Sequence, residues 1–174
     1  MKYFAYGEKM FTPQLLAIVP NASVMGVAKI RGYKLFFHSK GHDDPSGKCN
    51  IIPVRDLSCE VMGVLYEIAP AERHLLDRCE HLGYGIQETT LKVSPLNDDN
   101  DNPDQFAFTY IANKENVFED LIPFSWYKDL IISGAREHHL PEDYIKHLEN
   151  MACMQDPNAY RANKQKRFLE SIHS

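Results

Sequence analysis

The chain has 174 residues and a mass of 20.0 kDa, the size of one ordinary domain. Hydrophobic residues make up 44% and charged residues 25%, so the composition excludes disorder, collagen-like repeats and a coiled coil as descriptions of the whole chain. The net charge of −5 argues against general nucleic-acid binding through phosphates. We expect one domain over residues 1–174, with a helical C-terminal extension over about 150–174.

The four cysteines stand singly along the chain, without a Cys-x-x-Cys pair. This pattern favours reduced thiols and a cytoplasmic protein. Residues 1–9 lack the apolar core of a signal peptide, and no apolar run approaches the ~18 residues of a membrane span. We therefore expect no membrane association.

The first third of the chain favours strands. Residues 2–6 are β-prone and end at Gly7, and Thr12 with Pro13 predicts the N-cap and first residue of a short helix. Further expected elements are two strands, or one long bent strand, over 23–39, a loop over 42–47, and strands over 49–54 and 60–68.

The apolar spacing then changes to that of a helix. Pro70 predicts the start of a helix that runs to about Leu82, with Gly83 as its stop signal. Strands are expected over 86–94 and 105–112, joined by a polar loop over 97–104. The last third favours three helices, which start at Ser125 as a cap, at Pro141, and at Asn158 as the cap of a basic helix.

Strands thus dominate the first two-thirds and helices the last third. This order predicts an α+β fold with a mixed, largely antiparallel, barrel-like sheet, one inserted helix and C-terminal helices.

The sequence gives no metal-binding signal. His138 and His139 are adjacent, so their side chains diverge on a helix, and no His-Glu-x-x-His motif or Cys/His tetrad occurs. The acidic loop over 97–104 has Pro103 where a calcium loop needs Gly and Thr109 where it needs Glu. We expect no metal site.

Two segments carry residues suited to chemistry. In the first, Tyr3 to Gly7 form a strand that ends at a turn, where backbone N–H groups can hold an anion. In the second, Glu80 follows Leu76 by four residues and so borders the apolar stripe of the inserted helix. Apolar surroundings raise the pKa of a carboxyl group, which suits a general base. Asp77 and Arg73 lie one turn apart and are expected to form an exposed pair.

These segments resemble the gamma-glutamylcyclotransferase family, the AIG2-like group with the BtrG-like fold. The resemblance covers about residues 3–148. Tyr3, Phe4, Ala5, Tyr6 and Gly7 reproduce the first five residues of the family's Tyr-Phe-Ala-Tyr-Gly-Ser-Asn segment, and Leu76 to Glu80 match its Leu-Asp-x-x-Glu motif. The family's second block resembles residues 26–35, and the strand before its catalytic helix resembles residues 61–66. Its C-terminal blocks have counterparts at residues 123–127, 134–137 and 140–144.

The chain departs from the family pattern at three positions. Glu8 and Lys9 stand where the family usually has Ser-Asn, and His81 replaces the Gly that usually follows the catalytic Glu. A Glu8 side chain aimed inward repels an anionic substrate, and Lys9 can offset that repulsion.

The resemblance implies an intramolecular aminolysis that converts a small γ-glutamyl substrate into 5-oxoproline and an amine or amino acid. It assigns Glu80 as the general acid and base, and the segment Tyr3 to Glu8 as the anchor of the substrate α-carboxylate. Tyr127 either donates a hydrogen bond to the substrate, forms the pocket wall or packs in the core. No metal or organic cofactor is implied, and the protein is expected to be a monomer or homodimer.

Two alternatives stay open from the sequence. Besides such an enzyme, the chain fits a non-catalytic relative that binds a small ligand. The Glu8-Lys9 departure favours this binding relative. A third possibility is a tailoring enzyme that removes a γ-glutamyl group from a biosynthetic intermediate, where the chemistry is the same and only the leaving amine differs.

Overall fold

The computed structural model describes residues 1–96 and 103–172. Its centre is a closed five-stranded barrel with the strand order β1-β5-β2-β6-β7. The strands are β1 (Lys2–Ala5), β2 (Ser23–Arg31), β5 (Glu60–Glu67), β6 (Ile86–Pro95) and β7 (Gln105–Ala112). Neighbouring strands pair antiparallel, except that β1 and β7 close the barrel in parallel through Tyr3 and Phe108.

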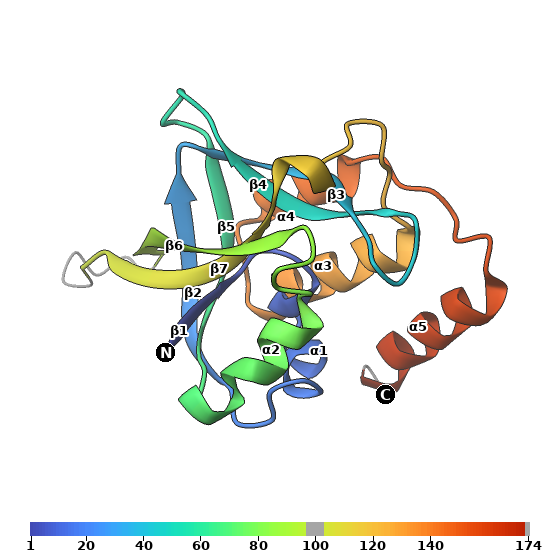
Figure 1. The fold of residues 1–174 in the computed structure, drawn as a ribbon, viewed down its shortest axis with the longest axis horizontal. Helices are drawn as coiled ribbons and strands as arrows, with labels where there is room; N and C mark the ends of the chain where they lie inside the picture. The colour runs from blue at the N-terminus through green and yellow to red at the C-terminus, as the bar shows by residue number, and fades with distance from the viewer. Residues whose placement is uncertain (97–102, 173–174) are drawn as a thin grey trace.

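Two further strands form a separate hairpin, β3 (Tyr33–Lys40) with β4 (Gly47–Pro53). Figure 1 shows this hairpin crossing one end of the barrel, beside α3. Residues 23–40 are therefore two strands, since Gly32, with φ at 74°, separates β2 from β3.

The helices follow the expected order. The bounds of the α-helices are α1 (Thr12–Leu16), α2 (Arg73–Cys79), α3 (Ser125–Glu137), α4 (Glu142–Asn150) and α5 (Ala159–Ile172). Three short 3-10 helices are η1 (Glu8–Met10), η2 (Pro70–Glu72) and η3 (Lys114–Asn116). Figure 1 shows α5 at the edge of the molecule, after an extended segment. Within the described residues, no helix is long and apolar enough to cross a membrane.

Glycine allows two close approaches that place the N-terminal segment. A Cβ at Gly63 would lie 2.2 Å from the backbone oxygen of Ala5, so β5 packs directly on β1. A Cβ at Gly134 would lie 2.4 Å from the backbone nitrogen of Phe11, so α3 packs directly on the end of η1. The turn that carries Glu8 and Lys9 is thereby held between the barrel and α3.

The α+β fold with a largely antiparallel barrel, an inserted helix and C-terminal helices is confirmed. Asn158 caps α5 as expected, because its side-chain oxygen accepts a hydrogen bond from the N–H of Arg161 at 3.0 Å. Residues 97–102 of the expected polar loop lie outside the described residues.

Four local expectations are wrong, and two of them concern helix caps. Phe11 and Phe124, not Thr12 and Ser125, are the N-caps of α1 and α3. The Thr12 hydroxyl instead lies 2.9 Å from Nε2 of His138, so tertiary contact overrides the local capping signal.

The helix α2 also ends earlier than Gly83. Its last turn closes with hydrogen bonds from His81 N to Arg78 O and from Leu82 N to Asp77 O, which form a Schellman motif. His81, with φ at 56°, occupies the left-handed position of that motif, where Gly is usual.

Arg73 and Asp77 do pair, at 2.8 Å, but the pair is not exposed. The Arg73 guanidinium packs 3.8 Å from the ring centre of Phe108, and the Tyr110 hydroxyl donates a hydrogen bond to Asp77. The pair therefore docks α2 onto β7 instead of lying in solvent.

Candidate active site

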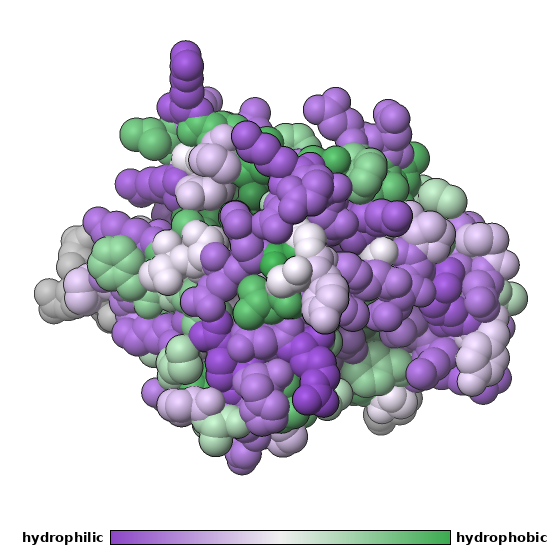
Figure 2. All heavy atoms as spheres, viewed as in Figure 1, coloured by the Kyte–Doolittle hydropathy of each residue, from purple (hydrophilic) through white to green (hydrophobic). Residues whose placement is uncertain are grey.

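A pocket of about 270 Å³ opens where the end of β1, the end of α2, the β3–β4 hairpin and α3 meet. Its lining includes Tyr3, Glu8, Lys9, Glu80 and Tyr127, which come from the start, the middle and the last third of the chain. Figure 2 shows a mostly hydrophilic face with a small apolar area near its centre, over the segment that joins α2 to β6. Such a concave site with convergent polar groups is the usual form of a small-molecule site.

Glu80 is placed in the pocket by the end of α2. It is the C-cap residue, and its N–H donates to Leu76 O at 2.9 Å. Its carboxylate lies 3.0 Å from the Lys9 ammonium and accepts a hydrogen bond of 3.4 Å from the Tyr3 hydroxyl. Burial raises the pKa of Glu80; Lys9 acts against this rise and the nearby Glu8 carboxylate adds to it.

Lys9 joins two carboxylates. Its side chain is only 6% exposed, and its ammonium lies 2.7 Å from Glu8 Oε1 as well as 3.0 Å from Glu80 Oε1. Burial alone lowers the pKa of an ammonium group, but the charges of Glu8 and Glu80 outweigh it and raise the pKa of Lys9. Lys9 is therefore a fixed positive charge in the pocket.

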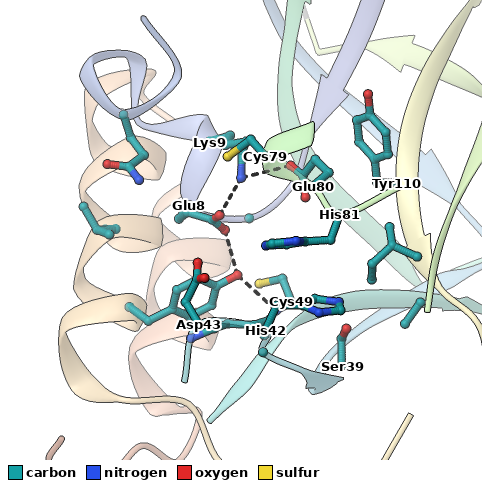
Figure 3. A pocket seen from close by; sticks show the side chains of 18 of the residues that line it. Glu8, Lys9, Ser39, His42, Asp43, Cys49, Cys79, Glu80, His81 and Tyr110 are labelled. Carbon is teal, nitrogen blue, oxygen red and sulfur yellow. Dashed lines mark hydrogen bonds and ion pairs between the residues drawn. The ribbon is translucent and has the colours of Figure 1, made fainter. Parts of the chain in front are cut away.

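Glu8 is the permanently charged carboxylate of the group. Burial acts to raise its pKa, but the charge and hydrogen bond of Lys9 and the hydroxyl of Tyr127 lower it to about 2. Tyr127 donates to Glu8 Oε2 at 2.7 Å and accepts from the N–H of Cys49 at 3.1 Å. Figure 3 shows this continuous path from Glu80 through Lys9 and Glu8.

The lowered pKa of Glu8 predicts a pH-dependent contribution to stability. The contribution is present above the unfolded value of 4.5 and is lost as the pH falls through the folded value of about 2. Its upper bound is roughly 3 kcal/mol, from the linkage between a pKa shift and free energy. We expect Glu8→Gln to lose most of this stability at pH 7 and to differ little from the unmodified chain near pH 2. Urea unfolding of both proteins between pH 2 and 7 measures the difference, and a gap that stays constant with pH contradicts the prediction.

The two cysteines at the pocket are poor nucleophiles. Burial raises the pKa of the Cys49 thiol well above its usual range, and burial also raises the pKa of Cys79. Thiols in that state carry little thiolate, which is the reactive form. Among the carboxyl groups at the pocket, Glu80 is the one whose pKa is raised, because of burial.

The sequence-predicted residues fall into two groups. Tyr3, Tyr6, Gly7, Glu8, Glu80 and Tyr127 all line the pocket. Phe4 and Ala5 do not: their side chains are fully buried in the barrel core, because β1 pairs on both sides and Phe4 packs against Gly63. Only their backbone remains near the site.

Sequence reasoning missed the contribution of the β3–β4 hairpin. His42, Asp43 and Cys49 from this hairpin line the pocket, and the His42 ring stacks on His81 with ring centres 4.2 Å apart. No local pattern marks such residues, because they reach the site only through the path of the chain. Among the residues that the structure describes, no cluster of three or more His, Cys, Asp or Glu side chains could hold a metal ion.

The model of the AIG2-like family matches residues 60–148, just over half of the chain. The chain belongs to the AIG2-like family. Two relatives of this AIG2-like chain, the gamma-glutamylcyclotransferases of Bos taurus and Homo sapiens, are each 26% identical over 161 residues, which is 91% of this chain and 80% of the relative. A solved structure of a gamma-glutamyl cyclotransferase superposes with a TM-score of 0.82 at 22% identity, covering 96% of this chain and 98% of the other.

The family assignment covers the segment that carries Glu80, and the structural match covers nearly the whole barrel with its helices. With the curated relatives, these findings support an enzyme of the gamma-glutamylcyclotransferase kind. This AIG2-like chain is thus a gamma-glutamylcyclotransferase-like enzyme.

Proposed function

We propose that the enzyme cyclises a small γ-glutamyl compound to 5-oxoproline and releases an amine or amino acid. The α-amino nitrogen attacks the γ-carbonyl carbon, a C–N bond closes the five-membered ring, and the bond from that carbon to the leaving nitrogen breaks. The observation that carries the proposal is Glu80, a half-buried carboxylate with raised pKa at the pocket wall, in a chain whose curated relatives are named for this reaction.

Glu80 acts as the proton carrier in this proposal. The substrate α-ammonium must lose a proton before its nitrogen can attack, and the leaving nitrogen must gain one. A carboxyl group whose pKa lies closer to neutrality exchanges protons in both directions more readily than an ordinary one. Lys9 and Tyr3 hold one Glu80 oxygen, Oε1, and this fixes the carboxylate for the transfer.

The pocket also brings the reacting ends of the substrate together. When the substrate is held curled so that its amine and carbonyl meet, this orientation lowers the activation barrier by roughly 7–11 kcal/mol. We propose that backbone N–H groups at the Gly7–Glu8 turn and the Lys9 ammonium bind the substrate α-carboxylate, with Tyr127 as a wall of the pocket. Lys9 offsets the negative charge of Glu8 beside it, which the sequence alone left open.

The site needs no organic cofactor or metal in this proposal, since proton transfer and orientation supply the chemistry. We further propose that the protein works in the cytoplasm, where its four cysteines stay reduced; all four are free thiols in the structure.

The test is 5-oxoproline release, measured by mass spectrometry. The purified protein is incubated with γ-glutamyl amino acids, γ-glutamylamines and glutathione, each separately. We expect 5-oxoproline and an equal amount of the free amine from at least one compound. Glu67→Gln, a change at an exposed carboxylate on the last residue of β5, serves as the control and should keep full activity. A folded protein that releases no 5-oxoproline from any compound contradicts the proposal.

A further inference from the structure

His81 holds an unfavourable backbone conformation immediately after Glu80. Its φ of 56° lies in the left-handed region, where a residue with a Cβ pays a steric cost. Only one other non-glycine residue in the described chain has positive φ, His139 at 54°. Both residues occupy the same position of a Schellman motif, at the ends of α2 and α3 respectively.

The two histidines differ in their surroundings. The side chain of His81 lines the pocket, and Figure 3 shows its imidazole extending into the pocket from the end of α2. His139 is not among the residues that line this pocket. The side chain at position 81 therefore affects the space available to a ligand, whereas the side chain at 139 does not.

The ring of His81 is held in place by its partner. It stacks on His42 with ring centres 4.2 Å apart and ring planes inclined by 26°. His42 belongs to the short connection between β3 and β4. The Asp44 carboxylate stabilises this connection, because it accepts hydrogen bonds from Ser46 and Lys48 at 2.5–2.8 Å. The stacked pair thus joins α2 to the hairpin across one side of the pocket.

The position of His81 relative to Glu80 identifies which part of a substrate it meets. In the proposed function, on which this inference rests, Glu80 protonates the leaving nitrogen. That nitrogen must then lie within hydrogen-bonding distance of Glu80, about 2.6–3.2 Å. In this proposal, the group attached to that nitrogen extends into the part of the pocket that His81 and His42 line.

We propose that His81 is a specificity-determining residue that narrows the leaving-group end of the pocket. The stacked imidazoles of His81 and His42 limit the enzyme to γ-glutamyl compounds whose leaving amine is small. A larger leaving group has to displace a His81 side chain that is stacked on His42.

The experiment compares one small and one bulky substrate, γ-glutamylalanine and γ-glutamylphenylalanine. We expect the unmodified protein to prefer the alanine compound in kcat/KM, and His81→Gly to raise the ratio of kcat/KM for phenylalanine over alanine at least tenfold. His139→Gly removes the same type of backbone strain outside the pocket, so it is the matched control. It should raise the melting temperature as His81→Gly does and leave the ratio unchanged.

A second measurement separates this inference from the proposed function. The dissociation constants of both compounds are measured by calorimetry with Glu80→Gln and with Glu80→Gln/His81→Gly. This binding measurement does not require turnover. In one outcome, 5-oxoproline never forms, but the bulky compound binds at least tenfold more tightly to Glu80→Gln/His81→Gly than to Glu80→Gln. The proposed function then fails and the steric role of His81 stands. If the bulky-to-small ratio stays within twofold in both turnover and binding, or neither compound binds, the inference about His81 is wrong.

Discussion

Glu80→Gln is expected to lower the rate of 5-oxoproline release by roughly 10²–10⁴-fold, the usual contribution of a positioned acid or base. The amide cannot accept the proton of the substrate ammonium, but it has nearly the shape of the carboxylate. It can still accept a hydrogen bond from Lys9, which stays paired with Glu8. Substrate binding should therefore persist. Steady-state kinetics by mass spectrometry, with calorimetry for binding, checks both parts.

The pH profile gives an independent test of the same role. The acid limb of kcat/KM reports the base of the free enzyme, so it should fall at a pH above the ordinary carboxyl value of 4.5 because burial raises the pKa of Glu80. Residual activity of Glu80→Gln should lack this limb. If Glu80→Gln turns substrate over as fast as the unmodified chain, another group is the base.

Lys9→Met is expected to have the largest effect on stability. The change removes a buried cation and leaves the carboxylates of Glu8 and Glu80 facing the same space without a counter-charge. Breaking a buried ion pair in this way costs about 3–5 kcal/mol of unfolding free energy. Urea unfolding at pH 7 measures the loss. A Lys9→Met protein as stable as the unmodified chain at pH 7 contradicts this account of the site.

The loss should depend on pH with a definite sign. Without Lys9 the pKa of each carboxyl group is higher than in the unmodified chain. Lys9→Met therefore loses stability relative to the unmodified chain as the pH increases. The deficit of Lys9→Met is therefore largest near pH 7 and shrinks towards pH 4. The acid limb of kcat/KM should move to higher pH, because Lys9 normally lowers the pKa of Glu80.

Glu8→Gln is a control in which the acid limb of kcat/KM should move in the direction opposite to that of Lys9→Met. Glu8 raises the pKa of Glu80, so its neutralisation should move the acid limb to lower pH. In the double variant Glu8→Gln/Lys9→Met, one of the two facing carboxylates is gone, and part of the lost stability should return. The double variant also keeps the test informative if Lys9→Met does not fold.

The order of the strands and helices follows from local sequence patterns. The β-prone residues 2–6, the helical stripe around Leu76 and the break at Gly32 are local patterns, and each strand and helix lies close to where they predicted it. Its distance of four residues from the buried Leu76 places Glu80 at the edge of an apolar face, but this spacing alone fits a surface residue better than a general base. The family resemblance pointed to the same residue, and the match to residues 60–148 includes it.

The contacts between charged groups in the pocket depend on the folded path of the whole chain. Lys9 and Glu80 are 71 residues apart, and Tyr127 reaches Glu8 across 119 residues, so no local spacing predicts either contact. The same holds for His42 and His81, which stack because the connection between β3 and β4 lies against the end of α2 at the pocket. Hydrophobic periodicity acts over a few residues and fixes secondary structure locally. A pKa depends on every charge within several ångströms, and those neighbours are set by the path of the whole chain.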